Sequence, residues 1–121
     1  MKHFAVIGSP VEYSLSPFLH NWFFKSLHLH AEYEKVRIEN QELPDIIQKI
    51  KKGQLDGINV TIPHKEDIMQ FLDEINPRAE TIGSVNFMMK SHTRIIGNNT
   101  DWFGFSQALE NNQIYVSVLA L

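Results

Sequence analysis

Apolar residues along this chain follow two alternating spacings, which predict alternating strands and helices. Apolar residues at every second position, as over residues 57–62, predict a buried strand whose polar residues point to the opposite face. Apolar residues three and four positions apart, as over residues 43–50, predict a helix with one apolar face. By the same rule we expect Leu19, Phe23 and Leu27 to be buried along one side of an earlier helix.

The order of the predicted elements indicates an α/β fold. Strand and helix alternate through the first half of the chain, so we expect a single three-layer α/β/α domain with a mostly parallel sheet. The predicted strands are residues 3–7, 33–38, 57–62, 85–89, 94–97 and 114–121, and the predicted helical segments are residues 16–27, 40–53, 64–72, 77–82 and 101–109.

Composition excludes several classes of protein. The 121 residues carry a formal net charge of −3, so no overall positive field attracts nucleic acid or an anionic membrane surface. There is no cysteine, and no apolar run approaches the roughly 18 residues of a membrane span. The start of the chain lacks the long apolar stretch of a signal peptide, so a cytoplasmic location is expected. His28 and His30 lack the surrounding carboxylates of a metal site, and no metal is expected.

The most informative segment is the strand over residues 57–62 and the turn that follows it. Pro63 ends the strand because it has no N–H to continue a central ladder. Asn59 and Thr61 point to the face opposite the apolar residues, and Lys65 follows just past the strand. Ligands bind at the carboxyl ends of strands in open α/β sheets, so these groups predict a site for a small polyhydroxylated anion. The alternative is a polar strand face beside a solvated lysine.

Three further polar groups lie at predicted strand ends or helix starts. Ser14 and Ser16 stand at a helix start, where two hydroxyls and the helix dipole favour a carboxylate, although Ser16 could simply be the N-cap. Asn86 follows a tight turn into a strand, which by itself is ordinary turn chemistry. Asp101 could meet Lys65, so that the pair orients a bound alcohol and manages its proton. The alternative is an N-cap for the last helix at residue 100 or 101.

Together and in this order, the clusters resemble the substrate-binding domain of shikimate dehydrogenase. The resemblance covers residues 3 to 109, and the combination is far more specific than any one motif. The matching motifs are Gly8-Ser9-Pro10-Val11-Glu12-Tyr13-Ser14-Leu15-Ser16-Pro17 with His20-Asn21, Asn59-Val60-Thr61-Ile62-Pro63-His64-Lys65, Val85-Asn86, and Asn99-Thr100-Asp101 with Gly104.

The resemblance implies an enzyme that reversibly reduces 3-dehydroshikimate to shikimate with NADPH, on the pathway to chorismate and the aromatic amino acids. It implies that Lys65 and Asp101 form the catalytic pair, with Lys65 polarising the reacting oxygen or moving its proton. This role suits them because hydride transfer leaves an alkoxide that needs a nearby acid or cation. The residues implied to bind substrate are Ser14 and Ser16 at its carboxylate, and Asn59, Thr61, Asn86 and Asp101 at its ring hydroxyls.

Two departures from the family pattern bear on this expectation. Phe87 stands where the family usually has threonine, and its ring could crowd the ligand or pack beneath the strand. The family continues into a nucleotide-binding domain; residues 1–109 resemble the substrate-binding domain, and residues 110–121 the start of the next. No G-x-G-x-x-G loop, which would cradle the NADP pyrophosphate, occurs in these 121 residues. We therefore expect the chain alone to be inactive or nearly so.

Other functions stay open at this stage. The chain could be a non-catalytic module that binds shikimate or quinate, or has a regulatory role, and both ligands suit the predicted site. It could also be a structural domain with a decayed site, although the intact Ser14, Ser16, Lys65, Asn86 and Asp101 argue against decay. Residues 114–121 are apolar and β-prone, so we expect them to dock on a neighbour, drive self-association or be disordered.

Overall fold

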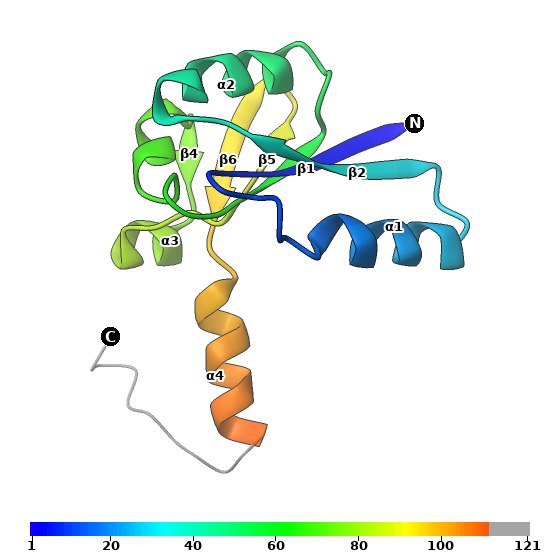
Figure 1. The fold of residues 1–121 in the computed structure, drawn as a ribbon. Coiled ribbons are helices and arrows are strands. Elements are labelled where there is room, and N and C mark those ends of the chain that lie inside the picture. The colour runs from blue at the N-terminus through cyan, green and yellow to red at the C-terminus, as the bar shows by residue number, and fades with distance from the viewer. Residues whose placement is uncertain (112–121) are drawn as a thin grey trace.

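Apolar alternation in this chain produces a six-stranded sheet with helices on both faces (Figure 1). The structure is a computed structural model, and it describes residues 1–111. The strands are β1 (Lys2–Gly8), β2 (Ala31–Arg37), β3 (Gly57–Val60), β4 (Glu74–Ile75), β5 (Phe87–Ser91) and β6 (Arg94–Asn98). The helices are α1 (Ser16–Ser26), α2 (Leu43–Lys51), α3 (Pro77–Ile82) and α4 (Asp101–Asn111), with 3-10 turns η1 (Asn40–Glu42) and η2 (Asp67–Phe71).

The sheet has the order β2-β1-β3-β5-β6-β4 and mixes two kinds of pairing. β1 pairs in parallel with both β2 and β3, as the alternation of strand and helix predicts. β5 is antiparallel to β3 and forms a hairpin with β6, while the short β4 runs parallel to β6. The predicted α/β class and layers are confirmed. Three of the five strand pairs are parallel, and the two antiparallel pairs both involve β5.

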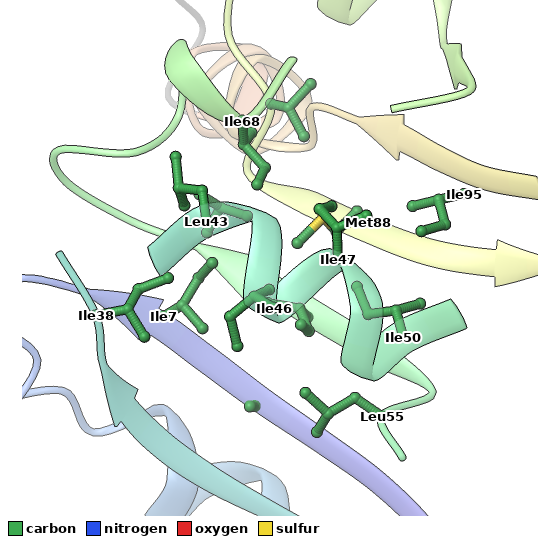
Figure 2. Packing of buried hydrophobic residues seen from close by; sticks show 14 of the residues in the cluster. Ile7, Ile38, Leu43, Ile46, Ile47, Ile50, Leu55, Ile68, Met88 and Ile95 are labelled. Atoms are coloured by element: carbon green, nitrogen blue, oxygen red, sulfur yellow. The ribbon is translucent and has the colours of Figure 1, made fainter. Parts of the chain in front are cut away.

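The hydrophobic core lies between α2 and one face of the sheet (Figure 2). The face of α2 predicted from spacing is buried there against residues of β1, β3, β5 and β6. Burying a side chain of this size contributes about 1.5–3 kcal/mol, so this layer supplies much of the stability. The α2 residues are Leu43, Ile46, Ile47 and Ile50, and their sheet partners include Ile7, Ile58, Met88 and Ile95.

Helix α1 does not bury the face that its apolar spacing predicts. Leu19, Phe23 and Leu27 remain 49%, 52% and 64% exposed, and no residue of α1 is fully buried. The helix instead turns His20 and Phe24 toward the sheet, where the Phe24 ring lies 5.7 Å from that of Phe4. The prediction for this face was wrong because α1 carries apolar residues on more than one side, and contacts with the sheet decide between them.

The segment after β3 also differs from prediction. The strand ends at Val60, and Ile62 is 71% exposed rather than buried. The helical turn expected from residue 64 begins at Asp67 as the 3-10 turn η2. His64, which its position in a turn suggests is exposed, is fully buried and hydrogen-bonds through Nε2 to the carbonyl of Ile38 at 2.7 Å.

Helix α4 leaves the sheet and projects away from it (Figure 1). It starts at Asp101 as expected, and none of its residues is buried. The strand predicted at 114–121, with its expected self-association, lies outside the described residues. Within residues 1–111, no helix is long and apolar enough to cross a membrane, and no cluster of three or more side chains suits a metal ion.

Candidate functional site

A cavity of about 490 Å³ lies at the carboxyl ends of β1 and β3. This is the edge at which parallel α/β sheets bind ligands. All seven residues singled out from the sequence line it: Ser14, Ser16, Asn59, Thr61, Lys65, Asn86 and Asp101. The remaining lining residues are Val6, Pro10, Val11, Tyr13, His20 and Val60.

The loop that carries Ser14 is fixed by charged residues at the end of β2. Ser9 donates its hydroxyl to Glu39 at 2.9 Å, and Arg37 contacts Glu12 at 2.8 Å. The Ser9 hydrogen bond is the main cause that lowers the pKa of Glu39, and hydrogen bonds to Glu12 and then Glu39 raise the pKa of Arg37. These exposed contacts join the loop to the end of β2.

The two serines stand at the N-terminus of α1. The amide of Ser16 donates to Ser14 Oγ at 3.3 Å, and Leu15 occupies the N-cap position expected for Ser16. Ser16 is thus the first helical residue. Pro17 follows it in the first turn, where a proline is tolerated because amides there have no helical partner. The two hydroxyls and the positive end of the helix dipole form a suitable place for an anion.

Gly8 allows Thr61 to reach the cavity. A Cβ at Gly8 would lie 2.5 Å from Thr61 Cγ2 and 2.8 Å from Val11 Cγ1, both far inside van der Waals contact. The amide of Thr61 donates to the carbonyl of Ile7 at 2.9 Å, which extends the contact between β1 and β3 past the last strand residue. Only glycine at position 8 permits this close approach.

Lys65 and Asp101, which both line the cavity, contact each other. Nζ of Lys65 lies 2.7 Å from Oδ2 of Asp101, and their side chains are 31% and 56% exposed. They are 36 residues apart in the chain, so the fold and not local sequence creates the pair. The ammonium and the carboxylate remain accessible to a ligand in the cavity.

Asn86 holds Asp101 and Thr100 in place from the buried side. Its Nδ2 donates to Asp101 Oδ1 at 2.9 Å and to Thr100 Oγ1 at 3.0 Å, which uses both amide hydrogens. Its Oδ1 accepts from the amide of Thr100 at 3.0 Å. Oδ1 also lies 3.4 Å from the Thr100 hydroxyl, so the polar atoms of Asn86 are directed at Thr100 and Asp101, and Asn86 acts mainly on these two residues.

Helix α4 begins at Asp101, which leaves Thr100 at the expected N-cap position, but the side chain of Asn99 and not of Thr100 accepts from the first amides of the helix. Oδ1 of Asn99 accepts from the amide of Asp101 at 2.9 Å and more weakly from that of Trp102, while its Nδ2 donates to the carbonyl of Ser84. Because Asn99 supplies the cap, the carboxylate of Asp101 is free for Lys65.

Phe87 lines a smaller cavity of about 250 Å³ beside the first one. The two cavities share His20 and Asn59, but Phe87 does not line the larger one. Of the two expectations for this ring, crowding the ligand or packing away from it, the structure shows the second.

Sequence reasoning missed one residue that supports the site. Tyr33 on β2 is buried, and its hydroxyl donates to Asn59 Oδ1 at 2.7 Å. His20 stacks on the Tyr33 ring with centroids 4.2 Å apart. A tyrosine among the charged residues of β2 was a usable signal, because a buried phenol needs a polar partner.

Comparison with known proteins gives the family. Residues 6–88 match the model described as the shikimate dehydrogenase substrate binding domain. The chain belongs to this family. It is 44% identical over 112 residues to the shikimate dehydrogenase (NADP(+)) of Pelagibacter ubique, covering 93% of this chain and 42% of that protein.

Solved structures of shikimate dehydrogenases match this chain in fold and sequence. The shikimate dehydrogenase of Thermus thermophilus in complex with shikimate matches with a TM-score of 0.88 and 37% identity, over 97% of this chain and 45% of that chain. A shikimate dehydrogenase in complex with NADP⁺ matches with a TM-score of 0.90 and 40% identity, over 97% and 41%. The chain therefore spans less than half the length of these relatives.

Proposed function

We propose that this chain forms the substrate half of an NADP-dependent shikimate dehydrogenase, which interconverts 3-dehydroshikimate and shikimate on the route to aromatic amino acids. The single observation that carries the proposal is the convergence of two serines, three amide or hydroxyl side chains and the Lys65–Asp101 pair on one cavity. Relatives that share this domain carry that name, and one of them was solved with shikimate.

The arrangement of donors gives the ligand a direction. Ser14 and Ser16, at the N-terminus of α1, would receive the carboxylate. Asn59 and Thr61, at the end of β3, would hold ring hydroxyls between the serines and Lys65. Asp101 would accept from a hydroxyl near the catalytic lysine.

The Lys65–Asp101 pair would manage the proton on the reacting oxygen. The ammonium of Lys65 can donate to a carbonyl oxygen and stabilise the negative charge that develops on it. Asp101 keeps that ammonium in place through its 2.7 Å contact, and Asn86 in turn fixes the carboxylate. In the opposite direction the same residues would take up the hydroxyl proton.

The cofactor of the family would supply or accept a hydride at the ring carbon. A cradle for its pyrophosphate requires a glycine-rich turn before a helix, and the six glycines of this sequence form no G-x-G-x-x-G pattern. The described residues thus do not fit the cofactor's phosphates. What these residues do is bind, orient and exchange a proton with the substrate.

Isotope-labelled chain titrated with shikimate, followed by NMR, tests the proposal. We expect saturable shifts confined to the cavity, and their loss in Lys65→Ala but not in the matched control Lys49→Ala on the exposed side of α2. Parallel titration with quinate compares the two ligands. No saturable shift at millimolar ligand would overturn the proposal for this chain.

A turnover assay separates enzyme half from binding module. The same 121 residues mixed with shikimate and NADP⁺ should show no reduction of the cofactor at ordinary dehydrogenase rates. Turnover at such rates would contradict the proposal that this chain supplies only the substrate half of the enzyme. Binding without turnover is also the result expected of a non-catalytic module. Joining the chain to the nucleotide-binding domain of a relative and restoring turnover would then favour the enzyme.

A further inference from the structure

Tyr33 is an unusual residue for the edge strand β2. The strand is otherwise rich in exposed charged side chains, yet Tyr33 is only 5% exposed. Its hydroxyl reaches Asn59, 26 residues away, at 2.7 Å. The hydroxyl thus ends beneath a residue that lines the cavity.

Three contacts hold the tyrosine in this position. His20 stacks on its ring at 4.2 Å with planes within 10°, and Nδ1 of His20 donates to the carbonyl of Ser16 at 2.8 Å. The side chain of Asn21 donates to the carbonyl of Tyr33 and accepts from its amide, at 2.8 and 2.9 Å. The phenol is therefore fixed by α1 as well as by its own strand.

The hydrogen bond determines which end of the Asn59 amide faces the ligand. Because the phenol donates to Oδ1, the NH₂ group is turned away from Tyr33, and no hydrogen bond of Nδ2 to any residue in 1–111 is present. Burial raises the pKa of Tyr33 to about 12, and a hydrogen bond with the Ser16 side chain lowers it by a smaller amount. The phenol thus remains a proton donor throughout the neutral range.

We propose that Tyr33 is a positioning residue that fixes the Asn59 amide with its NH₂ group toward the cavity, so that this point of the site recognises an acceptor oxygen on the ligand ring. The inference rests on the proposed function and deepens it. An NH₂ group binds a hydroxyl or a carbonyl oxygen equally, so this contact is available to both the oxidised and the reduced ligand. The specificity lies in requiring an oxygen, because a ligand without one leaves the NH₂ group unpaired.

The test is a double-mutant cycle on shikimate affinity. Tyr33→Phe keeps the ring stacked on His20 and removes only the hydroxyl, and we expect affinity to fall about tenfold. Asn59→Ala should weaken binding by at least as much. If Tyr33 acts through Asn59, the double variant should match Asn59→Ala alone, whereas two independent effects would multiply to about a hundredfold. Multiplying effects, or unchanged affinity in Tyr33→Phe, would overturn the inference.

Two further measurements separate positioning from general damage. The side-chain NH₂ resonances of Asn59, assigned by their loss in Asn59→Ala, should shift with shikimate in the wild type and lose most of that shift in Tyr33→Phe. Thr81→Val, which removes an exposed hydroxyl on α3 outside the cavity, should leave both affinity and these resonances unchanged. Absence of shikimate binding by the wild type is a different result, which rejects the proposed function itself.

Discussion

Asn86 donates to the carboxylate oxygen of Asp101 that Lys65 does not contact, at 2.9 Å. The two oxygens of Asp101 therefore have separate partners, one from the buried side and one from the cavity. An orienting contact of this kind fixes the direction in which the lysine is presented to a ligand.

We expect Asn86→Ala to damage both stability and binding. The change leaves the amide of Thr100 without its acceptor and frees the Asp101 carboxylate to rotate. The free energy of unfolding should fall by about 1–3 kcal/mol in urea denaturation, and shikimate affinity should fall about tenfold. Asn40→Ala, at an exposed residue of η1, serves as the control and should change neither. Wild-type affinity in Asn86→Ala would contradict an orienting role.

Gly8→Ala and Gly104→Ala should have opposite effects on stability. At Gly8 the new methyl group would collide with Thr61 and Val11, so we expect a loss of about 1–3 kcal/mol and weaker ligand binding. At Gly104, inside α4, an added Cβ would meet no atom of residues 1–111 within 4 Å apart from its own helix backbone, and the better helix former should stabilise by about 0.5–1 kcal/mol. Thermal unfolding followed by circular dichroism measures both, and equal effects would show that the tight contact at Gly8 is not maintained.

Burial should differ sharply between two leucines that apolar spacing treats alike. Leu43→Ala removes a fully buried side chain from the core, and we expect a loss of about 2–5 kcal/mol. Leu19→Ala removes a side chain that is half exposed on α1, and the expected change is within about 0.5 kcal/mol. Urea denaturation measures the free energy of unfolding of both variants. A large loss in both would contradict the exposed position of Leu19 on α1.

The raised pKa of Tyr33 predicts a specific pH dependence at high pH. Its ordinary value of 10.0 rises to about 12 in the folded chain, because burial disfavours the phenolate. The neutral phenol therefore contributes stability fully below pH 10, and this contribution is lost as the pH rises through about 12. The difference in unfolding free energy between wild type and Tyr33→Phe should fall across that window. A constant difference would show that Tyr33 titrates normally.

The convergence of the candidate site was predictable from the sequence because it depends on topology. Asn59, Thr61 and Lys65 follow one strand, and Ser14 follows its parallel neighbour, so both sets must meet at the same sheet edge. Asp101 could be added because a family motif places it with them. The antiparallel β5–β6 hairpin was predictable as a pair of strands, but its place beside β3 depends on packing that no local pattern reports.

The residues that sequence reasoning misplaced are those whose surroundings come from distant segments. His64 is buried, and its Nε2 donates a hydrogen bond at 2.7 Å to the carbonyl of Ile38, 26 residues away. Tyr33 belongs to the site for the same reason, through Asn59. The face of α1 was misjudged because Asn21 and His20, which are polar, make its contacts with β2. Spacing rules assume that apolar residues face the sheet, and here polar contacts decide.

Helix α1 bears Ser16 yet has no buried residue, and its hold on the sheet comes from Asn21, His20 and Phe24. The cavity therefore has two ends with different evolutionary freedom. Substitutions around Asn59 and Thr61 disturb a tightly packed strand junction, so they risk unfolding the domain. Substitutions at the exposed residues of α1 remove no buried side chain, so the end of the cavity that would receive the carboxylate is where a change of ligand could arise first at little cost to folding.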